Sequence, residues 1–326
     1  MPKAGVLHLM ILVLISILLT PDGEAAELKK ASLMPLWSTQ AQFAGYYVAL
    51  DKGIYARHGI DLTILKGGPS VSPSEHLQNG KADFAVLSLA AALQQNGAGN
   101  RLVNVAQIIQ KSSMMLIARK TSGIRTPADF QGRKVGVWNG DLAANAFFTK
   151  YQVRVQQIPQ SYTVNLFLRG GIDAVSAQWH NEYHTILNSG IKADELNIFF
   201  LDDHGIRFPE DGLYILERNY RKDPAFAASF AKASLEGWRY AFDHPDEALD
   251  IVIRTMKKEH LPANRLHQKW MLEKMRDQMK PRKNGGEMGQ LSPSDYEAVG
   301  LALRTRGVIT TVPGFEDFIG RHDAQQ

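Results

Sequence analysis

Residues 31–65 read ASLMPLWSTQAQFAGYYVALDKGIYARHGIDLTIL, a stretch that contains one strand–helix–strand unit. Residues 31–36 and 61–65 are short, largely apolar runs of strand length, whereas residues 43–57 have the length and the apolar spacing of a helix. Two strands that are joined through a helix normally lie parallel in one sheet. The stretch therefore predicts an α/β fold with short connections.

The same alternation of strand and helix continues on the carboxyl side of this unit. Further strands are predicted at residues 83–87, 102–109, 114–118, 134–138, 153–158, 174–178, 198–201 and 213–217, with helices at 73–79, 127–130, 142–151, 164–169 and 181–188. After residue 217 the chain is mostly helical, with helices at 224–242, 245–258, 264–279 and 293–304. We expect two α/β lobes, each a mostly parallel sheet flanked by helices. Residues 28–113 and 212–326 form lobe one, and residues 114–211 form lobe two. Two crossings, near 110–115 and 203–212, form a hinge.

The first 25 residues have the pattern of a cleaved signal peptide. Lys3 provides a positive start, residues 6–19 are almost wholly apolar, and small residues precede the expected cleavage after Ala25. The apolar run is shorter than a membrane span requires. The chain contains no cysteine, which excludes disulfides and a lipidated anchor cysteine. We therefore expect export to the periplasm as a freely diffusing protein.

Composition and motifs argue against nucleic-acid binding and against catalysis. The chain has 37 Lys and Arg against 33 Asp and Glu, and the basic residues are scattered apart from the run at 280–283. No G-x-S-x-G, P-loop or G-x-G-x-x-G motif is present. His180 and His184 flank Glu182, but the H-x-E-x-H order is not a zinc-peptidase motif and no third ligand is near. We predict no catalytic residue, no cofactor and no metal.

Aromatic and amide side chains recur where the predicted strands end. Trp37 follows the first strand, Trp138 and Asn139 follow another, and a third ends in the run 178–183 with Trp179, Asn181, Glu182 and Tyr183. In such sheets ligands bind beyond the carboxyl ends of the strands. A tryptophan there can stack on a flat ring or hold a cation, although each ring can equally serve to cover the core.

Glu182 is the main polar candidate at these strand ends. Beside a helix N-terminus its charged form is expected to be stabilised, and it can accept hydrogen bonds from a ring amine or hydroxyl while Asn181 offers both a donor and an acceptor. A plain first-turn helix charge remains the alternative. Asp141, Glu210 and Asp211 are weaker candidates, each expected to be structural, and Gly67-Gly68-Pro69 is predicted as a turn that at most offers backbone N–H groups.

The run 37–55 resembles the type II periplasmic binding proteins, in the branch of sulfonate receptors and relatives of the fungal thiamine-pyrimidine synthase. Further resemblances lie at 59–62, 80–85, 132–138, 172–175, 181–183, 209–213, 237–241 and 245–248. The resemblance implies a solute receptor for an ABC importer, with a permease and an ATPase as partners, acting as a monomer. The complete set of candidate ligand-binding residues is Trp37, Gln42, Phe43, Tyr46, Ser88, Trp138, Asn139, Trp179, Asn181, Glu182 and Tyr183.

The resemblance leaves the ligand open. The aromatic positions look more like those of receptors for heterocycles such as thiamine pyrimidine precursors. An alkanesulfonate or nitrate site needs convergent donors, a role that Ser88 at a strand end can serve. A ligand sensor for a membrane signalling partner is a further alternative. The synthase is the least favoured reading, because Leu87 and Ala91 stand where a by-eye alignment places its lysine and histidine, and its cysteine-rich segment has no counterpart.

Overall fold

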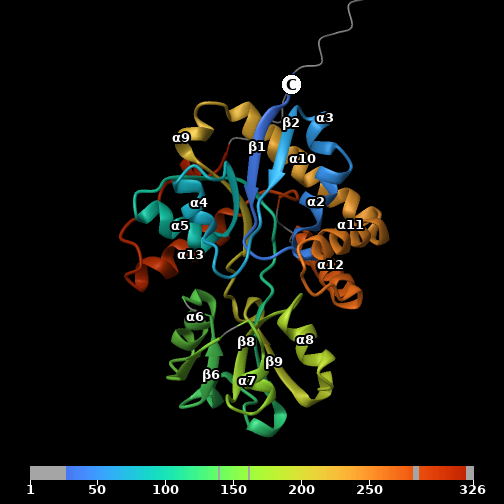
Figure 1. Ribbon diagram of the computed structural model, residues 1–326. Helices are drawn as coiled ribbons and strands as arrows, with labels where there is room; N and C mark the ends of the chain where they lie inside the picture. Colours follow the sequence, from blue (N-terminus) through green and yellow to red (C-terminus); the bar gives the residue numbers. More distant parts are fainter. Residues whose placement is uncertain (1–26, 139, 161, 282–285, 321–326) are drawn as a thin grey trace, which may run out of the picture.

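A computed structural model describes residues 27–138, 140–160, 162–281 and 286–320. The predicted signal peptide, residues 1–25, and Asn139 therefore lie outside the described residues. The chain builds two five-stranded sheets, each with helices on its faces. Figure 1 shows them as an upper lobe, formed by the beginning and the end of the chain, and a lower lobe formed by its middle. The predicted two-lobed α/β fold is confirmed.

The upper sheet is mixed, and its strands are in the order β2-β1-β3-β10-β4. β1 pairs in parallel with β2 and β3, and β10 pairs antiparallel with β3 and β4. The strands are β1 (Lys29–Met34), β2 (Ile60–Ile64), β3 (Phe84–Ser88), β4 (Leu102–Gln107) and β10 (Asp211–Leu216). We call this sheet with its helices the first lobe.

The lower sheet repeats the pattern in the order β7-β6-β8-β5-β9. β6 pairs in parallel with β7 and β8, and β5 pairs antiparallel with β8 and β9. The strands are β5 (Met114–Arg119), β6 (Lys134–Val137), β7 (Gln156–Pro159), β8 (Ala174–Gln178) and β9 (Leu196–Phe200). This sheet with its helices is the second lobe.

Each sheet contains one reversed strand because the chain crosses between the lobes twice. β4 ends at the junction, so the chain must enter β5 from the junction and run away from it. The return through residues 201–210 reverses β10 for the same reason. The remaining strands of each sheet point their carboxyl ends toward the junction, which is where ligands bind in sheets of this kind.

The helices agree broadly with the sequence pattern, with one clear difference at the start. The single helix predicted over 43–57 is divided into a 3₁₀ turn (Ala41–Phe43), α2 (Ala44–Asp51) and α3 (Ile54–Arg57). Gly53 causes the break, because its φ of 65° lies in the left-handed region. Among the described residues, no helix combines the length and the apolar character that crossing a bilayer requires.

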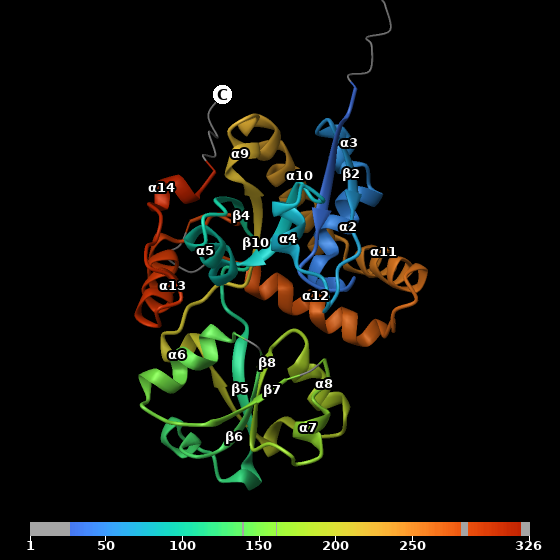
Figure 2. The same ribbon diagram turned by 60° about the vertical axis from the view of Figure 1, so that its left-hand side comes forward.

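The remaining helices flank the sheets in the two views of Figures 1 and 2. The first lobe contains α4 (Pro73–Gln78) and α5 (Leu89–Gly97). The second lobe contains α6 (Leu142–Lys150), α7 (Asn165–Leu168) and α8 (Glu182–Asn188). The carboxyl-terminal part contributes α9 (Glu217–Tyr220), α10 (Pro224–Asp243), α11 (Pro245–Lys258), α12 (Arg265–Met279), α13 (Pro293–Thr305) and α14 (Phe315–Phe318).

The carboxyl-terminal helices return to the first lobe because α10 packs closely on α2. A Cβ on Gly237 would lie 2.2 Å from the carbonyl oxygen of Gly45, so only glycine permits this approach. Trp238, which is fully buried, fills the space beside Gly45 and contacts Tyr46 with ring centroids 6.0 Å apart. This packing places α12, which follows α11, at the edge of the junction between the lobes.

The two crossings are tied together by hydrogen bonds. The Glu210 carboxylate accepts bonds from the Ser112 hydroxyl (2.6 Å) and from the Ser113 backbone N–H (3.1 Å). These three residues are buried. The contact joins the outgoing and returning segments where the chain crosses between the lobes.

Candidate ligand-binding cleft

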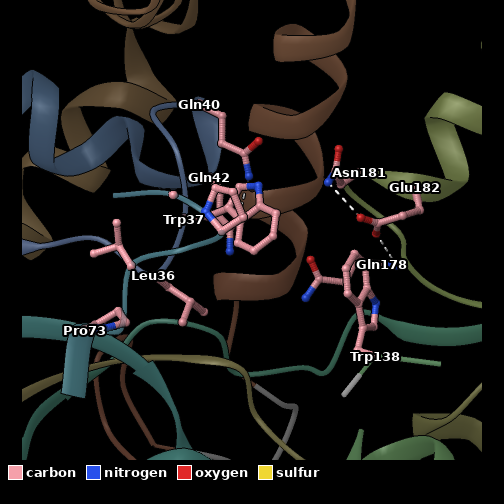
Figure 3. A pocket seen from close by; sticks show the side chains of 12 residues that line it. Leu36, Trp37, Gln40, Gln42, Pro73, Trp138, Gln178, Asn181 and Glu182 are labelled. Atoms are coloured by element: carbon pink, nitrogen blue, oxygen red, sulfur yellow. Dashed lines mark hydrogen bonds between the residues drawn. The ribbon is translucent and has the colours of Figure 1, made fainter. Parts of the chain in front are cut away.

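A cavity of about 380 Å³ lies at the junction, between residues of the two lobes. Figure 3 shows the first-lobe side chains facing Trp138, Gln178, Asn181 and Glu182 across it. Its lining consists of Leu36, Trp37, Gln40, Gln42, Gly68, Pro69, Val71 and Pro73 from the first lobe, and Trp138, Gln178, Asn181 and Glu182 from the second. Its volume is within the range of small-molecule sites.

Two tryptophans form the aromatic part of the cavity, one from each lobe. Trp37 and Trp138 meet edge to face, with ring centroids 6.3 Å apart and planes at 79°. Trp37 also contacts Tyr162 of the second lobe at 5.4 Å. Because these contacts join the lobes, Trp37 loses them if the lobes separate. A flat ligand can replace part of this contact by stacking on either ring.

The polar part of the second lobe centres on Glu182, the first residue of α8. One carboxylate oxygen accepts the Gln178 backbone N–H (2.9 Å) and the other accepts the Asn181 side-chain amide (2.9 Å). Burial raises the pKa of Glu182, and these hydrogen bonds offset the effect only in part. Backbone N–H groups favour the charged form of Glu182, as expected beside a helix N-terminus, but the removal of water has the larger effect on its pKa.

The first lobe contributes amides rather than charges. The Gln40 amide donates to Gln42 (2.6 Å), and the Gln42 amide donates to the Asp211 carboxylate (2.8 Å). Among the described lining residues Glu182 is the single ionisable side chain, and none is Lys or Arg. The cavity therefore offers hydrogen-bonding amides and one buried carboxyl group, without a cation to hold an anion.

Two contacts hold the first-lobe segment that contains Trp37 and Ala41 in place beside the cavity. A Cβ on Gly67 would lie 2.2 Å from the carbonyl oxygen of Trp37, so the loop can approach Trp37 only with glycine here. The buried side chain of Gln268, on α12, accepts the Ala41 backbone N–H at 2.7 Å. The position of Trp37 thus depends on segments far away in the sequence.

The structure brings Trp37, Gln42, Trp138, Asn181 and Glu182 to the cavity. It does not bring Phe43, Tyr46 or Ser88 there. Phe43 and Tyr46 are buried in the core of the first lobe, because the helix they begin turns that face toward α10. The Ser88 hydroxyl accepts the Ala91 backbone N–H and so caps α5.

Trp179 and Tyr183 also lie outside the cavity lining. Gln178 ends β8 and lines the cavity, whereas Trp179 lies in the turn that follows, with its ring toward Lys274 of α12. The Trp179 ring contacts Phe200 at 5.6 Å, and Tyr183 contacts Trp270 at 6.1 Å. Both therefore pack within or beside the second lobe and cannot stack on a ligand in this cavity.

The weaker candidates have structural partners. Asp141 caps α6 by accepting the Ala144 backbone N–H (2.9 Å) and also accepts the Ser176 hydroxyl (2.7 Å). Glu210 belongs to the crossing described above, and Asp211, the first residue of β10, accepts the Gln42 amide. His180 is buried, and burial lowers its pKa to about 4, whereas His184 faces the first lobe. Within the described part of the chain no group of three or more side chains is arranged as a metal site.

Sequence reasoning missed part of the lining, namely Leu36, Gln40, Val71, Pro73 and Gln178. Gln178 is the first residue of the run 178–183 and Gln40 lies three residues after Trp37, so both are strand-end amides like Gln42. Val71 and Pro73 carry none, because they follow a turn that only the tertiary fold places beside Leu36. The Gly68-Pro69 turn does reach the cavity.

Known proteins are similar to this chain over much of its length. The family model described as NMT1/THI5 like matches residues 40–248. A Haemophilus influenzae protein whose name points to thiamine biosynthesis is 23% identical over 89% of this chain and 91% of its own. The formylaminopyrimidine-binding protein of Halalkalibacterium halodurans is 21% identical over 74% of each chain.

An enzyme and a solved binding protein are also similar. The 4-amino-5-hydroxymethyl-2-methylpyrimidine phosphate synthase of Legionella pneumophila is 21% identical over 72% of this chain and 76% of its own. The solved periplasmic aliphatic sulphonate binding protein SsuA of Escherichia coli superposes with a TM-score of 0.66 and 14% identity, over 91% of this chain and 94% of that one. At that identity the likeness concerns the fold alone.

Proposed function

The chain belongs to the NMT1/THI5-like family, and from that premise we propose that it is the solute-binding component of an ABC importer. We propose further that its ligand is a small aromatic heterocycle, such as a thiamine pyrimidine precursor. The ligand would lie between the two lobes and stabilise their closed arrangement, because only the closed arrangement supplies contacts from both sides.

One observation carries the choice of ligand: the cavity joins aromatic rings to amides and a buried carboxyl group. A flat heterocycle fits against Trp37 or Trp138, and its ring amine can donate to Glu182 or to the amide oxygens. A sulfonate or nitrate needs convergent donors, commonly with a cation. The described lining has no Lys or Arg, so we favour the heterocycle over the anion.

The names of the relatives also bear on the choice of a heterocycle receptor. One relative is named for binding formylaminopyrimidine, which is a heterocycle of the proposed kind. Another is named as a synthase. By the by-eye alignment above, however, Leu87 and Ala91 stand where the fungal thiamine-pyrimidine synthase has a lysine and a histidine. We therefore propose a receptor and not an enzyme. It would act in the periplasm as a monomer and deliver its ligand to a permease that an ATPase drives.

Native mass spectrometry of the purified protein followed by calorimetry tests the proposal. We expect a co-purified heterocycle, and we expect formylaminopyrimidine to bind more tightly than the sulfonate MOPS. Riboflavin serves as a larger heterocyclic probe. Tight binding of MOPS with no response to either heterocycle would overturn the choice of ligand. Consumption of added pyridoxal phosphate would overturn the assignment as a receptor.

A further inference from the structure

A second contact joins the lobes outside the cavity, where α12 of the first lobe meets α8 of the second. The Trp270 indole N–H donates to the Trp179 carbonyl oxygen at 2.9 Å. The His184 ring stacks on Trp270 with centroids 4.8 Å apart and planes at 10°. Figure 1 shows α12 directly above α8. This contact crosses the same junction as the cavity.

Lys274 of the first lobe adds cation–π interactions to this contact between α12 and α8. The Lys274 ammonium group lies 4.4 Å from the centroid of Trp179 and 4.5 Å from that of Trp270. One of these rings belongs to each lobe, so the cation is attracted to both ring faces only when the lobes are together. We call Trp179, Asn181, His184, His267, Trp270 and Lys274 the α8–α12 latch.

The latch reaches the cavity through His267 and Asn181. The His267 Nε2 atom lies 3.0 Å from the Asn181 side-chain oxygen. The Asn181 amide nitrogen in turn donates to the Glu182 carboxylate at 2.9 Å. An amide oxygen accepts, so His267 Nε2 must donate. His267 thus fixes which end of the Asn181 amide faces Glu182.

The position of Asn181 makes this contact unusual. Asn181 precedes the first residue of α8, where an asparagine side chain commonly caps the helix. Here it makes no capping hydrogen bond, and its backbone angles are φ −127° and ψ −84°. Its side chain instead joins His267 of the other lobe to Glu182. The capping interaction is therefore replaced by one that requires the first lobe.

We propose that His267 is a positioning residue for the cleft, and that it orients Asn181 and Glu182 only when the lobes are closed. The role in binding rests on the proposed function, whereas the latch itself does not. Separation of the lobes removes the His267 contact and frees the Asn181 amide to turn. Closure of the latch and formation of the polar side of the cavity are then one event.

The latch can be measured without any ligand. Because the chain has no cysteine, spin labels can be attached at Leu266→Cys on α12 and Ser189→Cys after α8, both of which are exposed. We expect His267→Ala to shift the distance distribution toward longer separations. His267→Gln, which keeps a side-chain donor, should restore much of the short-distance population. Lys269→Ala, an exposed change on the same helix, is the matched control and should leave the distribution unchanged.

The binding role is measured separately with formylaminopyrimidine. Loss of one hydrogen bond predicts an affinity about 3- to 10-fold weaker in His267→Ala, expressed as faster release with an unchanged association rate. Unaltered label distances in His267→Ala would overturn the latch, whatever the protein binds. Altered distances with unaltered affinity and release would overturn the positioning role. If the unmodified protein binds no probe, the proposed ligand fails while the distance measurement still decides the latch.

Discussion

We predict that Glu210 makes the stability of this protein depend on pH in a direction opposite to that of most carboxyl groups. Burial raises its pKa from 4.5 to about 8, although the Ser112 hydroxyl and the Ser113 N–H lower it in part. Its second carboxylate oxygen is buried without a hydrogen-bond partner in the described part of the chain. Burial also raises the pKa of its neighbour Asp211 to about 7. The hinge thus holds protons that the unfolded chain releases.

The sign of the effect follows from proton counting. Between pH 4.5 and about 8 the folded protein keeps a proton on Glu210 that the unfolded chain has lost. The free energy of unfolding must therefore fall as the pH rises through this window. The stabilisation that comes from the proton on Glu210 is fully present below pH 4.5 and is lost above about pH 8. Its slope for one group is at most about 1.4 kcal/mol per pH unit.

Urea unfolding at a series of pH values from 5 to 8.5 measures this slope. Glu210→Gln imitates the protonated acid and can still accept both hydrogen bonds, so its profile should be flatter than that of the unmodified protein. The exposed change Glu297→Gln should leave the slope unaltered. Parallel profiles for the unmodified protein and Glu210→Gln would refute the reasoning, because they would show that Glu210 is ionised in the folded protein.

Three further predictions concern the cavity and export. Trp37→Ala should weaken heterocycle binding, measured by calorimetry, by roughly ten- to a hundredfold, since burial of a large ring contributes roughly 1–3 kcal/mol. An unchanged affinity with a large drop in melting temperature would show that the ring only packs against the protein. Glu182→Gln should have a similar effect, because removal of the carboxylate leaves a donor of the ligand unpaired in a dehydrated cleft. Amino-terminal sequencing of the periplasmic fraction should begin at Ala26, and a retained Met1 in a membrane pellet would contradict the proposed processing.

Local sequence pattern was enough to predict most elements of this fold. The strand at Ala174–Gln178 and the helix at Pro245–Lys258 have the predicted bounds, because apolar period and flanking residues act over a few neighbours. Helix breaks at glycine are harder to place, as the division at Gly53 shows. The alternation of strand and helix also predicted that strand ends would meet at one junction, which is why Trp37, Trp138 and Glu182 were found.

The sequence by itself determined which residues stand at strand ends, and hence the kind of chemistry that gathers at the junction. It could not determine which way each side chain points. Gln178, the last residue of β8, lines the cavity, whereas the ring of its neighbour Trp179 faces α12, since the chain leaves the strand and turns at this point. Gln268, on a helix more than two hundred residues away, holds Ala41 beside the cavity only because α10 packs on α2 and brings α12 to the junction. Contacts of that range depend on the complete packed core, and so the tertiary structure alone decided which of the strand-end residues line the cavity.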